Sequence, residues 1–198
     1  MAANGGLPRT AYVNARLIEP ASGLEMSGAL LVEGGRIADF GARLFAEGVP
    51  EGITRVDAEG LCLAPGLVDM RVHLREPGEE HKETIQTAST AAAAGGVTTM
   101  VCLPDTHPPI DDVAVVEFVA RRAREVKGVK IFAHAALTRG LAGKQLTEMG
   151  LLAEAGALAF TDGTKAVADA VVMRRALSYA KMFGRVIVQH PEEPRLAK

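Results

Sequence analysis

The chain has 198 residues, of which 48% are hydrophobic, enough to bury the core of one or two domains. Its 22 basic and 24 acidic side chains give a net charge of −2, which argues against a nucleic-acid-binding surface and against an acidic tail. No stretch reaches the roughly 20 apolar residues of a membrane-spanning helix, and residues 1–9 lack the apolar core of a secretory signal. We therefore predict a cytoplasmic protein with a loose tail over residues 1–9, which binds neither nucleic acid nor a membrane.

Residues 10–66 have the pattern of short strands separated by turns. The pair Gly34-Gly35 stands between two apolar runs and predicts a β-hairpin. Cys62 and Cys102 each lie alone in an apolar run, which predicts buried free thiols in a reducing compartment. The segment ends at Pro65-Gly66 and predicts a small β module. Its strands are expected over residues 12–18, 29–33, 36–41, 55–57 and 61–64.

From Leu67 onward, strands alternate with helices. Asp111-Asp112 supplies a helix N-cap, and Gly95-Gly96 supplies a helix C-cap. The almost unbroken apolar run at 96–103 is typical of a strand that is covered on both faces. Alternation at this interval predicts right-handed βαβ units on a parallel sheet, hence an α/β fold. Strands are expected over 67–73, 97–103, 129–134, 157–161 and 185–190, and helices over 83–94, 111–126, 145–155 and 169–183.

Two architectures fit this pattern. An eight-stranded (β/α)8 barrel needs about 250 residues, so five strands and four helices over residues 67–198 would form the N-terminal part of a barrel. An unpaired buried strand edge would then remain, which is an aggregation hazard. The alternative is a doubly wound open sheet, which would be complete at this length.

Polar side chains follow each predicted strand of the second segment. In either architecture, ligands bind at the carboxyl ends of the parallel strands. Histidines and carboxylates gathered from several strand ends are typical of a metal site. Taken singly, His107 and His134 are better explained as caps or core residues, and for His73 and His190 the two explanations are balanced. A solvated basic face is the less favoured alternative for the first strand. The residues concerned are Arg71, His73 and Arg75 on one face of the first strand, then Asp105, His107, His134, Asp162 and His190.

Several motifs resemble dihydroorotases of the long bacterial type, which are cyclic amidohydrolases. They occur in the expected order and cover the chain from about residue 12. The resemblance is carried by Pro65-Gly66-Leu67-Val68-Asp69, the run His73-Leu-Arg-Glu-Pro-Gly78, Lys82-Glu83, the block 93–99, Pro104-Asp105-Thr106, the runs 136–140, 155–162 and 173–177, and His190.

The resemblance implies a distorted (β/α)8 barrel and a small β-sandwich built from both chain ends. Residues 10–66 would be half of the sandwich, and residues 67–198 somewhat over half of the barrel. Members of the family use one or two zinc ions to activate a hydroxide, and they interconvert carbamoyl-aspartate and dihydroorotate in pyrimidine biosynthesis. Homo-oligomers and an aspartate carbamoyltransferase partner are expected from the same resemblance.

The resemblance also implies roles for individual residues. Arg75 matches the arginine that binds the substrate carboxylate, for which its planar fork is suited. His73 matches the second histidine of the first-strand metal pair, and His190 matches the metal ligand after the fifth strand. The last histidine ligand and the catalytic aspartate follow later strands, so no catalytic residue is assigned within these 198 residues.

Three positions depart from the family pattern. Arg71 stands where the family has its first histidine ligand, and a permanently charged donor cannot coordinate zinc. Gly163 stands where the family has a metal-binding carboxylate, for which Asp162 is the nearest replacement. Asp105 replaces an asparagine that binds the substrate carboxylate. Two like charges 4 Å apart repel by about 4 kcal/mol at an effective dielectric constant near 20.

These departures leave three hypotheses. The first is a dihydroorotase homologue without the standard zinc site, in which an Arg71–Asp105 salt bridge fills the emptied place and the protein has a structural or regulatory role. The second is an active amidohydrolase with a rearranged, mononuclear site. The third is an unrelated open-sheet binding protein. Lys165 is the lysine nearest to a strand end, but it does not stand where a carboxylated metal bridge would be needed. We favour the first hypothesis.

Overall fold

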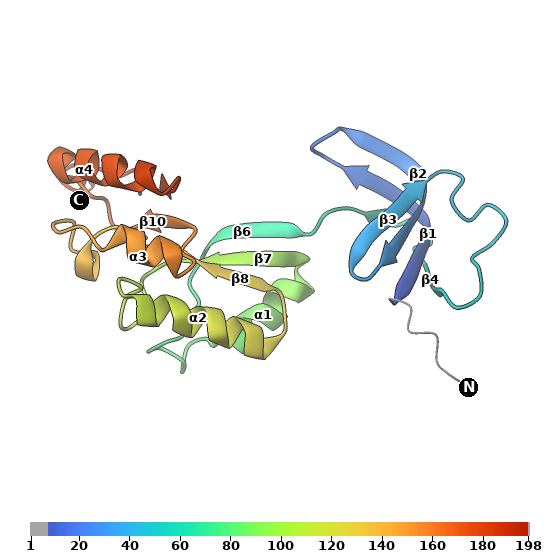
Figure 1. Cartoon of the computed structure of the whole chain (residues 1–198), viewed down its shortest axis with the longest axis horizontal. Helices are drawn as coiled ribbons and strands as arrows, with labels where there is room; N and C mark the ends of the chain where they lie inside the picture. The colour runs from blue at the N-terminus through green and yellow to red at the C-terminus, as the bar shows by residue number, and fades with distance from the viewer. Residues whose placement is uncertain (1–7, 198) are drawn as a thin grey trace. The chain divides into compact units, whose positions relative to one another are not determined.

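A computed structural model describes residues 8–197 of the chain. The chain divides into two compact units, Met1–Pro65 and Gly66–Lys198 (Figure 1). Within the described part, no helix is both long enough and apolar enough to cross a membrane. Of the predicted N-terminal tail, residues 1–7 lie outside the described residues, and the first strand already begins at Arg9.

The first unit contains a five-stranded sheet with the strand order β3-β2-β1-β4, in which β5 also pairs with β1. Neighbours β1, β2 and β3 are antiparallel, whereas β4 and β5 run parallel to β1. Gly34 and Gly35 form the β2–β3 turn with φ of 56° and 77°, so the predicted hairpin is confirmed. The strands are β1 (Arg9–Glu19), β2 (Leu24–Glu33), β3 (Arg36–Gly41), β4 (Thr54–Asp57) and β5 (Cys62–Leu63).

This sheet is covered on one face by its own chain. Ala11, Val13 and Ala29 are buried against partly buried side chains of residues 44–53. The other face forms an apolar groove of about 390 Å³, in which Ile37 and Phe40 remain largely exposed. The described residues form one sheet in this unit and do not include the second layer of a sandwich. Cys62 is exposed here, so its predicted burial is wrong, whereas Cys102 is buried as predicted.

The second unit is an α/β unit with parallel strands. One set pairs in the order β6-β7-β8 and the other in the order β9-β10-β11. Only His134 separates β8 from β9, so the strands follow one another in space as they do in sequence. This is the order of successive barrel strands, and a doubly wound sheet would reverse its direction. The strands are β6 (Leu67–Val72), β7 (Val97–Cys102), β8 (Lys130–Ala133), β9 (Ala135–Ala136), β10 (Ala159–Thr161) and β11 (Val186–Ile187).

The helices of this unit begin at polar caps. Asp112 accepts a hydrogen bond from the Ala114 amide at 2.9 Å, as the sequence predicts, and Asp169 accepts one from Val171 at 2.7 Å. Thr84 and Thr87 form a reciprocal capping box. The helices are α1 (Ile85–Ala94), α2 (Val113–Val126), α3 (Met149–Glu154) and α4 (Ala170–Met182), with a short 3₁₀ helix η1 (Arg139–Leu141).

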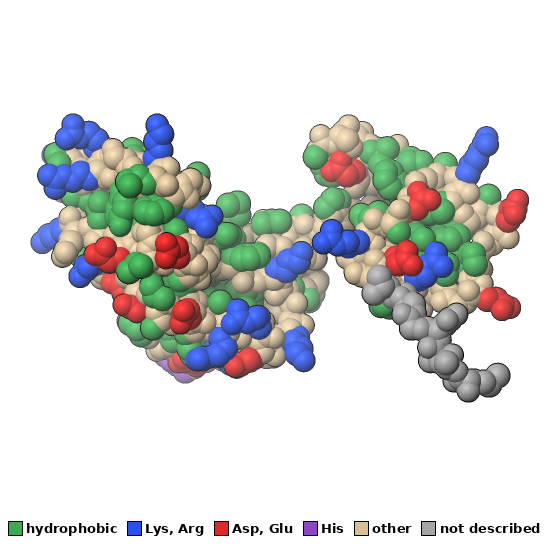
Figure 2. Space-filling view, in the orientation of Figure 1, with side chains coloured by type: hydrophobic (Ala, Val, Ile, Leu, Met, Phe, Trp, Pro, Cys, Tyr) green, Lys and Arg blue, Asp and Glu red, His purple; other side chains and the backbone are tan. Residues whose placement is uncertain are grey.

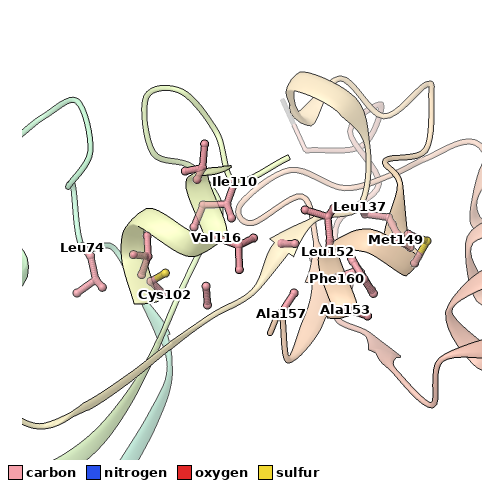
Figure 3. Packing of buried hydrophobic residues seen from close by; sticks show 14 of the residues in the cluster. Leu74, Cys102, Ile110, Val116, Leu137, Met149, Leu152, Ala153, Ala157 and Phe160 are labelled. Carbon is pink, nitrogen blue, oxygen red and sulfur yellow. The ribbon is translucent and has the colours of Figure 1, made fainter. Parts of the chain in front are cut away.

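One hydrophobic core joins the helices to the strands of this unit. Figure 3 shows Met149 and Leu152 of α3 beside Phe160 of β10, and all three side chains are fully buried. Helices α1 and α2 both lie on one side of β6, β7 and β8 (Figure 1). The polar residues of interest lie at or just beyond the ends of these strands.

Strand β6 departs from the prediction of a buried strand. Leu67, Val68 and Met70 are 61%, 59% and 59% exposed, and Figure 2 shows hydrophobic side chains at the surface along this strand. The reason is its position, because β6 is an edge strand that pairs with β7 alone among the described strands. An apolar pattern therefore identified the strand correctly but not its burial.

Candidate active site

The polar residues predicted at the strand ends lie at one edge of the second unit, because its paired strands are parallel. Two contacts define the candidate site, and both involve a residue at or just after the end of β6. His73 Nδ1 lies 2.7 Å from Asp105 Oδ2, after β7. Arg71 Nη2 lies 3.3 Å from His190 Nδ1, after β11. The His73 nitrogen does not have the direction of a hydrogen bond, so its contact with Asp105 is a close polar contact and not a hydrogen bond.

The predicted salt bridge between Arg71 and Asp105 is wrong. Asp105 contacts His73, and the longer Arg71 side chain reaches the end of β11. The period of two along a strand places Arg71 and His73 on one face, but it does not say which neighbouring strand end each side chain reaches.

His190 is in contact at both ring nitrogens. Its Nε2 lies 2.9 Å from Glu192 Oε2, while its Nδ1 faces Arg71. A carboxylate only accepts hydrogen bonds and a guanidinium only donates them. Nε2 therefore carries the ring proton and donates to Glu192, and the Nδ1 lone pair accepts from Arg71. Glu192 was not predicted as a site residue, and no motif in the sequence marks it.

Arg75, the predicted substrate-binding residue, is paired within its own loop. Its Nη1 donates to Glu79 Oε2 at 3.0 Å, and Lys82 contacts the other oxygen of the same carboxylate. The hydrogen bond from Lys82 is the main cause that lowers the pKa of Glu79, and Arg75 adds to it. A substrate carboxylate at Arg75 would thus compete with Glu79.

Glu76 fixes the loop that carries Arg75. Its side chain is buried, accepts from the Ile85 amide at 2.8 Å and accepts from Arg122 Nε at 2.8 Å. The first bond ties the loop to the start of α1, and the second ties it to α2. The sequence motif contains Glu76, but only the fold shows that the carboxylate points inward.

Asp162, the predicted replacement ligand, is engaged elsewhere. Its carboxylate accepts from the Thr138 amide at 2.8 Å and from the Thr138 hydroxyl. Burial raises the pKa of Asp162, and the hydrogen bonds from Thr138 oppose that rise. Gly163, next in the chain, has a φ of +69°, a conformation that glycine adopts without strain.

The other predicted candidates lie apart from these contacts or have structural partners. His134 is 2% exposed and donates from Nε2 to the Met70 carbonyl at 3.1 Å. Burial lowers the pKa of His134, which keeps the ring neutral. His107 is exposed, and Lys165 Nζ lies 3.5 Å from the Leu141 carbonyl. These three residues have no contact that assigns them to the candidate site.

The residues at this edge do not fit a zinc ion as they are arranged. Across residues 8–197, no group of three or more histidine, cysteine or carboxylate side chains is placed to hold a metal ion. The Nδ1 lone pair of His190 is used by a guanidinium, whose positive charge also repels a cation. The roles of His73 and His190 as metal ligands stay predictions.

Comparisons with known proteins agree on the family. The family model described as dihydro-orotase-like matches residues 60–198. The dihydroorotase of Wolbachia sp. subsp. Brugia malayi is 49% identical over 190 residues, which are 96% of this chain and 42% of that protein. The dihydroorotase of Ehrlichia chaffeensis is 48% identical over 184 residues, 92% of this chain and 41% of that protein. The chain thus spans about two fifths of the length of these relatives.

Solved structures show the same fold. An L-hydantoinase from Arthrobacter aurescens superposes with a TM-score of 0.73 at 21% identity, over 91% of this chain and 40% of that chain. A D-hydantoinase gives a TM-score of 0.69 at 21% identity, over 90% and 39%. At this identity the likeness concerns the fold alone, whereas the family model covers most of the sequence. The chain belongs to the dihydroorotase-like family.

Proposed function

We propose that this chain is the N-terminal part of a dihydroorotase-like protein of pyrimidine biosynthesis in which zinc-dependent hydrolysis is impaired or lost. The observation that carries the proposal is the contact between Arg71 Nη2 and His190 Nδ1 at 3.3 Å. Zinc needs that imidazole lone pair as a ligand, and it needs an environment without an adjacent fixed positive charge. The contact with Arg71 uses this lone pair and places a fixed positive charge beside it.

Substrate binding is weakened in the same proposal. By the resemblance, Asp105 takes the place of a residue that binds the substrate carboxylate, and repulsion between two such charges 4 Å apart is about 4 kcal/mol at an effective dielectric constant near 20. Its close contact with His73 offsets part of that charge only when the imidazole is protonated. Arg75 already has Glu79 as its carboxylate partner.

The remaining role is structural or regulatory. We propose a homo-oligomeric cytoplasmic protein that assembles with aspartate carbamoyltransferase. The exposed apolar side chains of β6 support a larger assembly or a completed barrel. The apolar groove on the first sheet supports a second sandwich layer over Ile37 and Phe40.

An active metal-dependent dihydroorotase with a rearranged site is the second candidate. His73 Nδ1 is buried without a hydrogen bond, which is an unusual state for a ring nitrogen and would suit a ligand. Arg75 and His190 also keep the residue types of the family. In this alternative, Arg71 would have to leave His190 before a metal ion could bind.

Metal analysis of the purified full-length protein, run beside a dihydroorotate hydrolysis assay, separates the two candidates. The Ehrlichia chaffeensis dihydroorotase, purified in the same way, serves as the reference. We expect far less than one zinc ion per chain and turnover well below that of the reference. One or two zinc ions per chain with comparable turnover would establish the active alternative.

A further inference from the structure

Arg71 connects two strands that share no backbone pairing. Among the described strands, β6 pairs with β7 only, and β11 pairs with β10 only. The Arg71–His190 contact joins the ends of these two strands across 119 residues of sequence. In a metal site built from strand ends, the ion makes this kind of connection by taking a lone pair from each side. Here a side chain of the protein itself makes it.

The protonation of His190 follows from its two partners. Glu192 faces Nε2 at 2.9 Å and can only accept, so Nε2 carries the hydrogen. Arg71 faces Nδ1 and can only donate, so Nδ1 keeps its lone pair. Guanidinium, imidazole and carboxylate thus form a chain of donors and acceptors in which every member has the required role.

We infer that Arg71 is the resident cation of this site: it uses the His190 lone pair that a metal ion would take, and it links the ends of β6 and β11 in place of a metal. The inference rests on the proposed function, because it assumes that zinc does not occupy the site. The contact with Glu192 supports it, since a carboxylate at Nε2 leaves the Nδ1 lone pair of His190 facing the guanidinium.

A double-mutant cycle on urea unfolding of the full chain measures the link. R71A and H190A should each reduce the folding equilibrium constant about two- to fivefold, the upper range for an exposed contact of a charged group. The double variant should lose hardly more than either single variant, because both remove the same contact. The control cycle is R139A with E148A, a surface pair at 3.0 Å whose side chains are 52% and 62% exposed. Its coupling should be close to zero.

A spectroscopic readout distinguishes this link from general loss of stability. In ¹⁵N spectra of the imidazole groups, His190 should show a protonated Nε2 and an unprotonated, hydrogen-bonded Nδ1. R71K should shift the Nδ1 signal even if R71A does not fold, because lysine lacks the planar fork that reaches the ring. R139A should leave the His190 signals unchanged.

Two results would overturn the inference: additive losses in the R71A and H190A cycle, or a rise in melting temperature with added ZnCl₂ in the wild-type chain that H190A abolishes. The outcomes separate this inference from the proposed function. Coupling between the two residues in a chain that still hydrolyses dihydroorotate would refute the proposed function alone. Additive losses in an inactive, zinc-free chain would refute the inference alone.

Discussion

At the residue scale, Glu76 is a buried charged side chain near the candidate site with a structural role. Its carboxylate is 5% exposed and bonds to both Arg122 and the Ile85 amide. Removing Glu76 would leave the Ile85 amide without its acceptor and would leave Arg122 with Glu125 as its carboxylate partner. The loop with Arg75 therefore depends on a residue that makes no contact with the candidate ligands.

Replacing Glu76 by alanine should lower the free energy of unfolding by about 2–4 kcal/mol, because one charged contact and one buried amide bond are lost together. E125A is the matched control, since Glu125 binds the same Arg122 at 2.7 Å but is half exposed. Its cost should stay below about 1 kcal/mol. Urea unfolding followed by circular dichroism measures both, and equal losses would contradict the role given to Glu76.

Asp162 should make stability depend on pH in a direction opposite to most carboxylates. Burial raises the pKa of Asp162 above its unfolded value of 3.8, so the folded chain binds the proton more tightly. The stabilisation is complete below pH 3.8 and is lost as the pH rises through the folded pKa. In D162N, the asparagine side chain keeps an oxygen acceptor for the Thr138 amide but has no group that titrates in this pH range.

The measurement is the difference in unfolding free energy between the wild-type chain and D162N. It is repeated at increasing pH, from about pH 3.5 upward in steps of about one pH unit. We expect the wild-type chain to lose stability relative to D162N as the pH increases. A difference that stays constant, or that changes in the opposite sense, would show that the Asp162 carboxylate is not destabilised by burial.

At the element scale, the loop after β6 packs closely on the turn after β7. Gly78 has a φ of +101°, and a Cβ atom there would lie 2.2 Å from the His107 carbonyl oxygen. G78A should destabilise the chain by about 2 kcal/mol or more through clash and backbone strain combined. G48A, with a φ of +103° and nothing within 4 Å of the added atom, isolates the strain.

Thermal unfolding of the two glycine variants should show a clearly larger loss for G78A than for G48A. The additional loss of stability in G78A measures the clash with His107, because Gly78 and Gly48 have nearly the same φ. If the losses were equal, the close packing of the loop after β6 on the turn after β7 would not contribute to stability. The position of Arg75 would then not depend on the turn after β7.

The element boundaries show what local sequence can predict. Helix α2 begins after Asp112, as the capping residue predicts, and the β2–β3 hairpin lies at Gly34-Gly35. Strand β11 spans only Val186–Ile187, against a predicted 185–190, and α3 is shorter than predicted. Caps and turn glycines act locally, whereas the length of a strand depends on pairing with a neighbour.

At the scale of the whole molecule, the exposure of β6 is open to a direct test. Met70 is 59% exposed, while Met100 on the paired strand β7 is 3% exposed. M100A should cost about 2–5 kcal/mol because it leaves a cavity, and M70A should cost less than about 1 kcal/mol. Urea unfolding of the 198-residue chain measures both.

The same two substitutions in the full-length protein show whether another part covers β6. A cost of M70A that rises to the level of M100A there would mean that this strand becomes buried, as in a closed barrel. Equal costs already in the 198-residue chain would contradict the exposure of β6 described here.

The sequence by itself determined the alternation of strands and helices, the parallel sheet, the caps and the family, because periodicity and turn residues act over a few neighbouring positions. It also led to the prediction, which stays a prediction, that Arg71, Asp105 and Gly163 depart from the family pattern. The tertiary structure decided that Asp105 meets His73, that Arg71 meets His190, that Glu76 points inward and that β6 is exposed. These outcomes depend on which strand ends lie side by side, and residues separated by 119 positions are brought together only by the packing of the whole unit.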